Sequence, residues 1–527
     1  MSTAASQQQN PASPVRADSA QASDLRRDLE GWTVDAIGEI MGDVALRALD
    51  REQVVPAVLA ARASDDRLAV LTRLAMLGDT VTRAEAQSAL PSLGVDGAVA
   101  TGLIEAAGRG LDDEVRALVD LRPTSSVGAD GELTWWMASD QAEAVTGSRL
   151  APDHVLGMGG ASAMLASATM RVPRSRVLDL GTGCGIQAMH ASLHADTVVA
   201  TDISRRALAF AEFNRELNAP PAAWSLREGS MLEPVARDVA QGSLFDLVVS
   251  NPPFVITPQG APSFEYRHGG LPGDAIVESL ISNVGSVLAP GGVAQMLGNW
   301  EIRRGTDWRE RLGDWLDASA AAGFPMDAWV IQRDALDGAE YAETWLRDGG
   351  VTPERGREEY EDAYRAYLAD FASRDVETVG FGIVTLRRAP ADRAPMRRLE
   401  EHEGQLPSPL GAHIVDVLAA HDWLAQTSDD ALLATALTVA SDVTKETYGR
   451  PLLHEPEHIL IRQGGGLGRS VRADTALAGL VGACDGELTV GQISHALAAL
   501  LDVPSGTMLA GMVPAVRDLV RDGFLVR

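Results

Sequence analysis

The residues whose types and spacing could do chemistry lie in two short segments of this 527-residue chain. The first, VLDLGTGCGIQ at 177–187, is a glycine-rich turn between a strand-like run and a helical one. The second, FDLVVSNPPFVITP at 245–258, ends a hydrophobic run with an amide, two prolines and an aromatic ring. Glycines let backbone N–H groups approach a ligand, and prolines leave rigid acceptors. The two segments together indicate a ligand site beside an acceptor pair.

The glycine spacing separates two classes of nucleotide ligand. A dinucleotide fingerprint places glycines at the first, third and sixth positions, but the sixth residue counted from Gly181 is Ile186. A carboxylate at the end of the next strand-like run, Asp202, can accept two hydrogen bonds from a ribose diol. We therefore expect a nucleoside ligand that lacks a pyrophosphate, such as S-adenosylmethionine. A tight strand-to-helix turn without a ligand is the alternative.

The segment Asp179 to Gly185, DLGTGCG, resembles the cofactor motif of class I S-adenosylmethionine-dependent methyltransferases, and Asp202 resembles their ribose-binding acid. The resemblance covers about residues 155–388. In that family the loop after the third strand flanks the adenine, and here Ser230 stands where many members have Asp. The resemblance implies S-adenosylmethionine as the cofactor, held by Asp179, Gly181, Thr182, Gly183, Gly185, Asp202, Ser230, Met231 and Asn251.

The tetrapeptide at 251–254 indicates what receives the methyl group. The Asn251 side-chain oxygen and the Pro252 carbonyl are two close acceptors, which suit an NH₂ group, and Phe254 can stack on the planar group that carries it. Holding both N–H bonds aims the nitrogen lone pair at the sulfonium methyl, so positioning suffices and no metal is needed. A plain strand terminator is the alternative. The tetrapeptide is similar to the (N/D)PP(Y/F) motif of amino-methyltransferases, which act on adenine N6, guanine N2 or protein glutamine amides.

The segment that follows favours one substrate. NPPFV, then Gly269, Gly270 and Gly273, then a helical run resemble the HemK-type glutamine methyltransferases, including the eukaryotic and archaeal release-factor branch. A protein glutamine is therefore the first expected substrate. An RNA methyltransferase acting on guanine N2 or adenine N6 is the second reading, because such enzymes also carry NPPF. A regulatory or interaction protein with a vestigial methyltransferase domain is the third.

The elements that must position these residues form an α/β pattern. Strand-like and helical runs alternate from Arg174 to Arg388, which predicts a seven-stranded, mainly parallel, Rossmann-like sheet with helices on both faces. Between the last two strands, 337–375 carries eleven acidic and five arginine residues. We expect it to form an exposed helical hairpin beside the substrate pocket, where acidic charge favours a protein over nucleic acid.

Shifts in composition predict the domain boundaries. We expect a disordered lead at 1–23, a helical domain at 24–123, a methyltransferase domain at 124–398 with the acidic insertion, and a winged-helix-like domain at 399–527. The flanking domains would recognise the substrate or a partner.

Composition excludes several other classes. The formal charge is −28, which disfavours nucleic acid as a partner, and two cysteines cannot form a disulfide framework. No run of about eighteen apolar residues and no signal-like N-terminus appear, so we expect a soluble cytoplasmic protein without a membrane partner. HEPEH at 454–458 has the letters of a metalloprotease motif, but Pro456 interrupts the helix that two histidine ligands would require, so we expect no metal.

Overall fold

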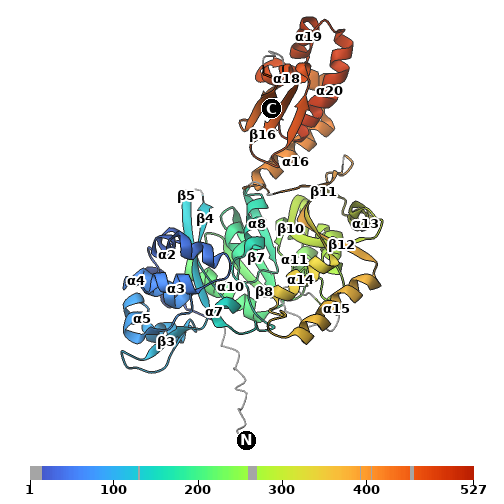
Figure 1. Ribbon diagram of the computed structural model, residues 1–527. Coiled ribbons are helices and arrows are strands. Elements are labelled where there is room, and N and C mark those ends of the chain that lie inside the picture. The colour runs from blue at the N-terminus through green and yellow to red at the C-terminus, as the bar shows by residue number, and fades with distance from the viewer. Residues whose placement is uncertain are drawn as a thin grey trace. The chain divides into compact units, whose positions relative to one another are not determined.

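The computed structural model describes residues 15–128, 131–258, 270–391, 393–404, 406, 408–451 and 456–527. Figure 1 follows the chain from blue to red, and the chain forms two compact units. The first holds the described residues up to Ala166, Val172–Ala389 and Arg397–Leu399, and the second holds Ser167–Arg171, Pro390–Met396 and Glu400–Arg527. Among the described residues, no helix combines the length and the apolar character that crossing a membrane requires.

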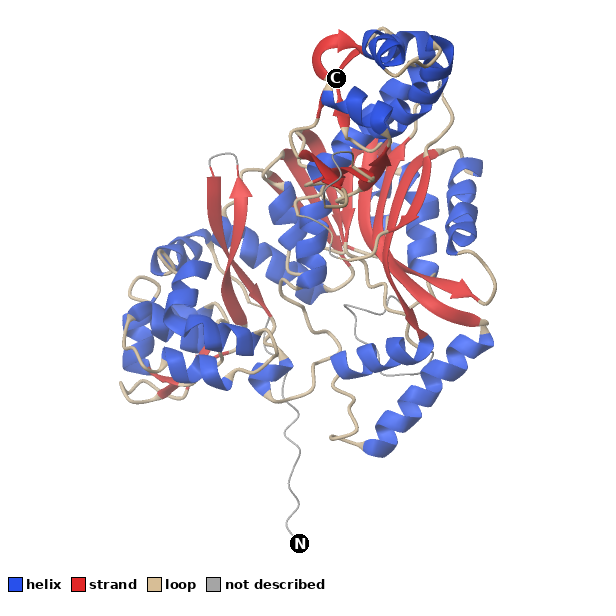
Figure 2. Ribbon diagram, turned by 45° about the horizontal axis from the view of Figure 1, so that its top comes forward, coloured by secondary structure: helices blue, strands red, loops and turns tan. Residues whose placement is uncertain are grey.

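A mixed eight-stranded sheet lies in the first unit, in the order β13-β11-β12-β10-β9-β6-β7-β8. Its strands are β6 (Arg174–Leu180), β7 (Ala195–Asp202), β8 (Ala223–Glu228), β9 (Phe245–Ser250), β10 (Leu288–Arg303), β11 (Met326–Asp337), β12 (Val376–Arg388) and β13 (Arg397–Glu401). Strands β6 to β10 are parallel, and β12 is antiparallel to β10 and β11. Figure 2 shows the strands in red with helices on either side, which confirms the α/β architecture.

The eighth strand corrects the expected count of seven. Residues 397–401, which span the expected boundary between the methyltransferase domain and the C-terminal domain, form β13 next to β11. Three contacts hold this segment: the Arg309 Nε donates to the Leu399 carbonyl at 2.9 Å, Leu399 packs on the sheet core, and the Arg398 guanidinium lies 4.7 Å from the Trp329 ring centre. The charged residues of this segment gave no strand pattern in the sequence, because contacts with residues far away in the chain stabilise the strand.

Two different cores cover the sheet. Helices α12 (Ala275–Asn283) and α13 (Trp308–Ala321) pack on the strands through one core, which includes Val248, Val277 and Leu312. Helices α9 (Ile186–Ala191) and α10 (Arg205–Asn218) belong to a second core that extends into the N-terminal region. The remaining short helices of this part are α7 (Glu143–Thr146), α8 (Gly160–Ala168), η2 (Glu233–Val235), α11 (Ala236–Ala240) and η3 (Val284–Ser286).

The acidic insertion contains two helices, α14 (Gly338–Asp348) and α15 (Arg357–Ser373), which pack on each other. The Asp337 side chain begins α14 as its N-cap, because it accepts hydrogen bonds from the Ala339 and Glu340 N–H groups at 2.8 and 2.9 Å. Aromatic residues on both helices, Tyr341, Tyr367 and Phe371, are buried. The hairpin therefore has an apolar face of its own.

The N-terminal region contains helices and also a small sheet in the order β1-β3-β2. Its elements are α1 (Ser19–Asp28), α2 (Val34–Leu49), α3 (Val55–Ala61), α4 (Arg67–Leu71), the π-helical turn η1 (Thr72–Met76), β1 (Val81–Thr82), α5 (Arg83–Ala89), α6 (Gly94–Ala100), β2 (Ile104–Ala106) and β3 (Glu114–Ala117). From α4 to β3 the elements follow one another in the order helix, strand, helix, helix, strand, strand. Strands of two to four residues leave no alternating pattern in a sequence.

The expected disordered lead at 1–23 needs a correction over its described part. Helix α1 already begins at Ser19, and Asp18 forms a capping box with Gln21. Val15, Ala22 and Leu25 are buried. Residues 15–23, the described part of the expected lead, are therefore ordered, and the polar sequence did not reveal the helix cap at Asp18. Residues 1–14 lie outside the described residues.

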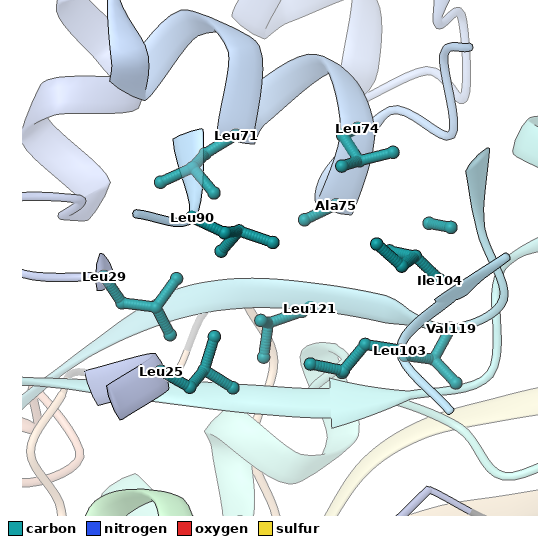
Figure 3. A pocket seen from close by; sticks show the side chains of 11 residues that line it. Leu25, Leu29, Leu71, Leu74, Ala75, Leu90, Leu103, Ile104, Val119 and Leu121 are labelled. Carbon is teal, nitrogen blue, oxygen red and sulfur yellow. The ribbon is translucent and has the colours of Figure 1, made fainter. Parts of the chain in front are cut away.

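A small cavity of about 20 Å³ lies in the N-terminal core. Figure 3 shows leucines from several elements pointing toward it, among them Leu25, Leu71, Leu74 and Leu121. An apolar space of this size has room for about one water molecule and offers it no polar partner. It is a packing void and no ligand site. A two-stranded ribbon, β4 (Asp120–Gly128) and β5 (Gly131–Ser139), links this core to the sheet domain.

The second unit contains two small sheets, in the orders β18-β14-β19 and β15-β16-β17. Its elements are α16 (Gly411–Gln426), α17 (Asp429–Leu433), β14 (Ala436–Val439), β15 (Val443–Tyr448), β16 (His458–Gln463), β17 (Ser470–Ala473), α18 (Thr475–Gly482), β18 (Asp485–Thr489), α19 (Val490–Leu500), α20 (Ser505–Arg521) and β19 (Leu525–Val526). Strand β14 precedes α18, α19 and α20 in the chain but lies between β18 and β19 in the sheet. The winged-helix-like character of this domain stays a prediction.

Candidate active site

Three of the expected site residues lie at one edge of the sheet. Asp179 is in β6, Asp202 ends β7 and Asn251 follows β9. The register pairs Leu180 with Ser250, and the Ser250 hydroxyl donates to the Leu180 carbonyl at 2.8 Å. Parallel strands therefore bring these residues together at their carboxyl ends, where open α/β sheets bind ligands.

The glycine-rich turn leaves space above its backbone. Gly181, Gly183 and Gly185 have φ of +74°, +54° and +90°, a region that favours glycine. A Cβ added at Gly181 or Gly183 would meet no atom within 4 Å, whereas one at Gly185 would lie 3.3 Å from the Ala211 Cα. The first two glycines leave room for a ligand, and the third lets the turn pack closely against α10.

Asp179 is completely buried beneath this turn. Its Oδ2 accepts hydrogen bonds from the Thr182 hydroxyl at 2.6 Å and from the Ala188 N–H at 2.9 Å. Its Oδ1 has no hydrogen-bond partner among the described residues. Burial raises the pKa of Asp179 to about 7, and the two hydrogen bonds only partly oppose that rise. Thr182 therefore acts on the carboxyl group and fixes its orientation.

Asp202 is half-buried and tied to the same turn. One carboxylate oxygen accepts the Gly183 N–H and the other accepts the Ser204 N–H, both at 2.9 Å. Carboxylate oxygens can each accept more than one hydrogen bond, which suits recognition of a diol. The next residue, Ile203, is 64% exposed, although it is aliphatic. The sequence analysis did not identify Ile203. It could have been found as an apolar residue directly after the acidic residue that ends a strand.

The loop after β8 lies beside Asp202, because the Gly229 N–H donates to the Asp202 carbonyl at 3.0 Å. Met231 has φ +49°, is half-buried and packs on the sheet core. Ser230 is half-buried, and its carbonyl accepts the Glu233 N–H at 3.1 Å. Both residues are thus near the glycine-rich turn, and their contact with adenine stays a prediction.

The tetrapeptide forms a tight turn at the same edge. Asn251 is half-buried, and no described residue forms a hydrogen bond with its side-chain amide. The Phe254 N–H donates to the Pro252 carbonyl at 2.8 Å. That carbonyl keeps one lone pair for a second donor. Phe254 is half-buried and packs against both the sheet core and the core of the insertion.

Two further residues next to the tetrapeptide were invisible to sequence reasoning. Tyr341 from the insertion and Asn299 from β10 are fully buried, and the Asn299 Nδ2 lies 3.0 Å from the Tyr341 hydroxyl. Neither belongs to a motif. Only the fold brings residues 42 positions apart to this edge.

The glycine segment downstream is described in part. Gly269 lies outside the described residues. Gly270 and Gly273 have φ of +76° and +57°, and a Cβ at Gly273 would lie 2.9 Å from a Glu301 carboxylate oxygen. Gly273 therefore permits a close approach to buried Glu301. Within the described ranges no three His, Cys, Asp or Glu side chains gather in a way that could hold a metal ion, and His454 lies outside them.

The residues present fit S-adenosylmethionine. The open space over Gly181 and Gly183 lets a ligand come close to the backbone of the turn. The buried Asp179 Oδ1 offers an acceptor that no described residue uses. The Asp202 carboxylate lies at the same turn and is a group of the type that accepts hydrogen bonds from a ribose diol. An acidic lining also suits a cofactor with a sulfonium and an ammonium group.

Comparison with known families gives a match in the same part of the chain. The model of the methyltransferase small domain matches residues 157–324. Residues 30–118 and 416–527 match two families that are described only as domains of unknown function.

Each of two curated relatives matches a part of this chain. A release factor glutamine methyltransferase from Deinococcus radiodurans is 34% identical over 132 residues, 23% of this chain and 45% of the relative. A Methanocaldococcus jannaschii protein, provisionally described as a ribosomal RNA large subunit methyltransferase, is 35% identical over 79 residues, 15% of this chain and 20% of the relative. The chain thus spans less than half the length of these relatives.

Among solved structures, an S-adenosylmethionine-dependent methyltransferase from Geobacter sulfurreducens, in complex with S-adenosyl-L-homocysteine, aligns with 18% identity and a TM-score of 0.26. The alignment covers 45% of this chain and 92% of that structure.

Proposed function

We propose that the class I S-adenosylmethionine-dependent methyltransferase domain at the centre of this chain methylates the nitrogen of a planar NH₂ group, first of all a protein glutamine side chain. The observation that carries the proposal is the position of Asn251. Its amide follows β9 at the edge that also holds the glycine-rich turn, and no described residue occupies its hydrogen-bonding groups.

Each residue of the tetrapeptide has a separate task in this proposal. The Asn251 Oδ1 and the Pro252 carbonyl accept the two N–H bonds of the substrate and so aim the nitrogen lone pair. The Phe254 ring stacks on the planar group and excludes water from one side. A bond forms between nitrogen and the methyl carbon as the bond from that carbon to sulfur breaks, and the nitrogen releases one of its protons to solvent.

The cofactor supplies an activated methyl group when it is bound. Gly181 and Gly183 let the turn approach it, Asp202 accepts the ribose hydroxyls, and Asp179 offers its buried Oδ1 to a cationic part. Ser230 and Met231 flank the adenine, with Ile203 as a further apolar contact on the side of Asp202.

Charge and similarity support a protein substrate. The curated Deinococcus relative is named for glutamine methylation of a release factor, and it is 34% identical to this chain over 132 residues. The formal charge of −28 and the acidic hairpin α14–α15 disfavour a phosphate backbone. RNA is the second candidate, because the archaeal relative is described as acting on ribosomal RNA. A cytoplasmic location agrees with either substrate and stays a proposal.

Labelling of an extract tests the proposal. Purified protein and cofactor with a radioactive methyl group are added to an extract of cells that lack this protein. We expect incorporated counts that protease removes and RNase leaves, and acid hydrolysis should release labelled methylamine from a methylated amide. Asn251→Ala should lower incorporation at least about 100-fold, because one misplaced contact costs that much in orientation.

Asn283→Ala is the matched control, since Asn283 is an exposed amide whose Nδ2 bonds only to the Ser279 carbonyl at 2.8 Å. It should retain full incorporation. Counts that RNase removes would establish the RNA reading instead. Tight cofactor binding without incorporation into any fraction would support a regulatory protein with a vestigial site.

A further inference from the structure

The acidic insertion packs directly on the segment that follows the tetrapeptide. Val255 and Ile256 share a buried core with Tyr341 and Phe371 of the hairpin α14–α15, and Phe254 packs on the edge of this core. The insertion therefore forms one side of the candidate active site.

One hydroxyl group joins three elements on this side of the site. The Tyr341 Oη accepts the Ile256 N–H at 2.8 Å and the Asn299 Nδ2–H at 3.0 Å. Ile256 is two residues beyond Phe254, and Asn299 belongs to β10, the neighbour of β9 in the sheet. Buried hydrogen bonds of this kind are costly to leave unmade, so they fix the relative positions of their partners.

The tyrosine ring is itself held from two sides. Phe381 of β12 stacks on it, with ring centres 5.7 Å apart and planes at 24°, and Phe371 of α15 meets it edge-on at 5.5 Å. Burial raises the pKa of Tyr341 well above its ordinary value, so the hydroxyl remains neutral. The hydroxyl thus occupies one position.

Helix α15 of the hairpin is anchored at both of its ends. Arg374, directly after α15, bonds to Glu301 of β10 at 2.7 Å and to Asp370 of α15 at 2.7 Å. Near the start of α15, Glu359 forms a bidentate pair with Arg149 at 2.8 Å. A rigid hairpin can transmit its position to the segment that it contacts.

We infer that Tyr341 is a positioning residue for methyl transfer, because it fixes the segment 254–256 and thereby holds the Phe254 ring where the planar acceptor stacks. This inference rests on the proposed function. Two prolines deprive the tetrapeptide of backbone donors, so its conformation depends on contacts made just beyond it. A displacement of about 1 Å at a reacting group can cost on the order of 100-fold in rate.

Tyr341→Phe removes the hydroxyl and leaves the ring. Tyr364→Phe is the matched control, because the Tyr364 hydroxyl bonds only within the hairpin, to the Ala339 carbonyl at 3.3 Å and to Glu343 at 3.2 Å. Hydrogen exchange of the full-length proteins is followed in the peptide that contains Ile256. We expect faster exchange there in Tyr341→Phe and no change in Tyr364→Phe.

Methyl incorporation into the extract's protein fraction is then measured against cofactor concentration. Tyr341→Phe should lower the maximal rate about 10- to 100-fold with the KM for S-adenosylmethionine unchanged within about twofold. The double variant Tyr341→Phe with Phe254→Leu should lose no more rate than Phe254→Leu alone, because both changes act on one ring.

Three results would overturn the inference: unchanged exchange at Ile256, an unchanged maximal rate, or additive losses in the double variant. A wild-type protein that binds the cofactor and methylates nothing would refute the proposed function separately. Exchange at Ile256 would still decide in that case whether Tyr341 fixes the segment.

Discussion

At the scale of a single residue, Asp179 makes the stability of the folded protein depend on pH. Burial raises the pKa of this carboxyl to about 7, so the protonated form is favoured in the folded state. The stability that this form contributes is fully present below the unfolded pKa, near ~3.9, and is lost as the pH rises to about 7. The largest possible loss is about 4 kcal/mol, from a shift of about three pKa units.

We expect Asp179→Asn to flatten this pH dependence. An amide oxygen can still accept the bonds from Thr182 and Ala188, and the NH₂ would replace the Oδ1 that no described residue uses. Urea unfolding at pH 5 and pH 8 measures the difference for wild type and variant. Asp196→Asn changes an exposed carboxyl and should retain the wild-type difference. Identical pH dependence in wild type and Asp179→Asn would contradict the prediction.

Gly183 permits a second test at this scale. We expect Gly183→Ala to weaken cofactor binding at least about tenfold, because the new methyl group enters the open space over the turn. The positive φ adds about 1 kcal/mol of strain. Gly242→Ala is a fair comparison, since Gly242 also has positive φ, +79°, and open space around it, but lies after α11.

Calorimetric titration with S-adenosylmethionine distinguishes the two glycine variants. Both should lose similar stability, and only Gly183→Ala should lose affinity. Equal affinities would remove the glycine-rich turn from the cofactor site.

At the scale of elements, the ion pair between Arg374, directly after α15, and Glu301 of β10 is the main connection between the hairpin and the sheet. Glu301 is 1% exposed, and Arg374 meets it through two nitrogens. Burial raises the pKa of Glu301, and the arginine opposes that rise. We expect Arg374→Met to destabilise the protein by about 3–5 kcal/mol near neutral pH, because it leaves a buried carboxylate without its partner. The loss should be smaller at pH 5 than near neutral pH, because burial raises the pKa of Glu301 and Arg374→Met removes an arginine that lowers it.

Denaturant unfolding at both pH values checks this expectation. Arg365→Met is the control, since Arg365 is 68% exposed and pairs with Glu361 and Asp362 on the same helix. It should cost less than about 1 kcal/mol. A similar small loss for Arg374→Met would mean that the hairpin is not anchored there.

The elements also explain which parts of the site a sequence could reveal. The glycine-rich turn and the tetrapeptide are local, so their residue types and the alternation of strands and helices were enough to bring Asp202 and Asn251 to one edge. Tyr341 was out of reach, because its partner Ile256 lies 85 residues away and a buried tyrosine has no distinctive neighbours in the sequence. Strand β13 and the strands β1 to β3 were missed because they are short or charged and depend on tertiary partners.

At the scale of the whole molecule, the N-terminal region and the cofactor turn share one core. Leu25, Trp32 and Leu74 belong to the same buried cluster as Ile186 and Phe213. Two amides of α10 also bond to the backbone of β5, and the Asn214 Nδ2 additionally donates to the Cys184 carbonyl in the turn at 2.8 Å. Residues 15–166 are therefore part of the body that holds the cofactor site.

This shared core predicts the result of truncation. A chain of residues 124–389 should lose cooperative unfolding and aggregate, because it exposes the apolar faces of α9 and α10. A chain of residues 1–404 should unfold cooperatively, because the core of the second unit involves residues from Ala420 onward. Thermal denaturation followed by circular dichroism compares them. A sharp transition in the chain of residues 124–389 would show that the sheet domain folds independently.

The position of β12 has a consequence for synthesis on the ribosome. In the finished sheet β12 separates β10 from β11, although it is translated after both. From the end of β10 at Arg303 to the end of β12 at Arg388, 85 residues must be added before the gap can close. At roughly 5–20 residues per second this takes about 4–17 s. During that interval the nascent chain carries an unpaired β10 edge and an unattached β11, so chaperone contact and aggregation of unfinished chains should concentrate there. The hairpin that shapes the site also prolongs that interval.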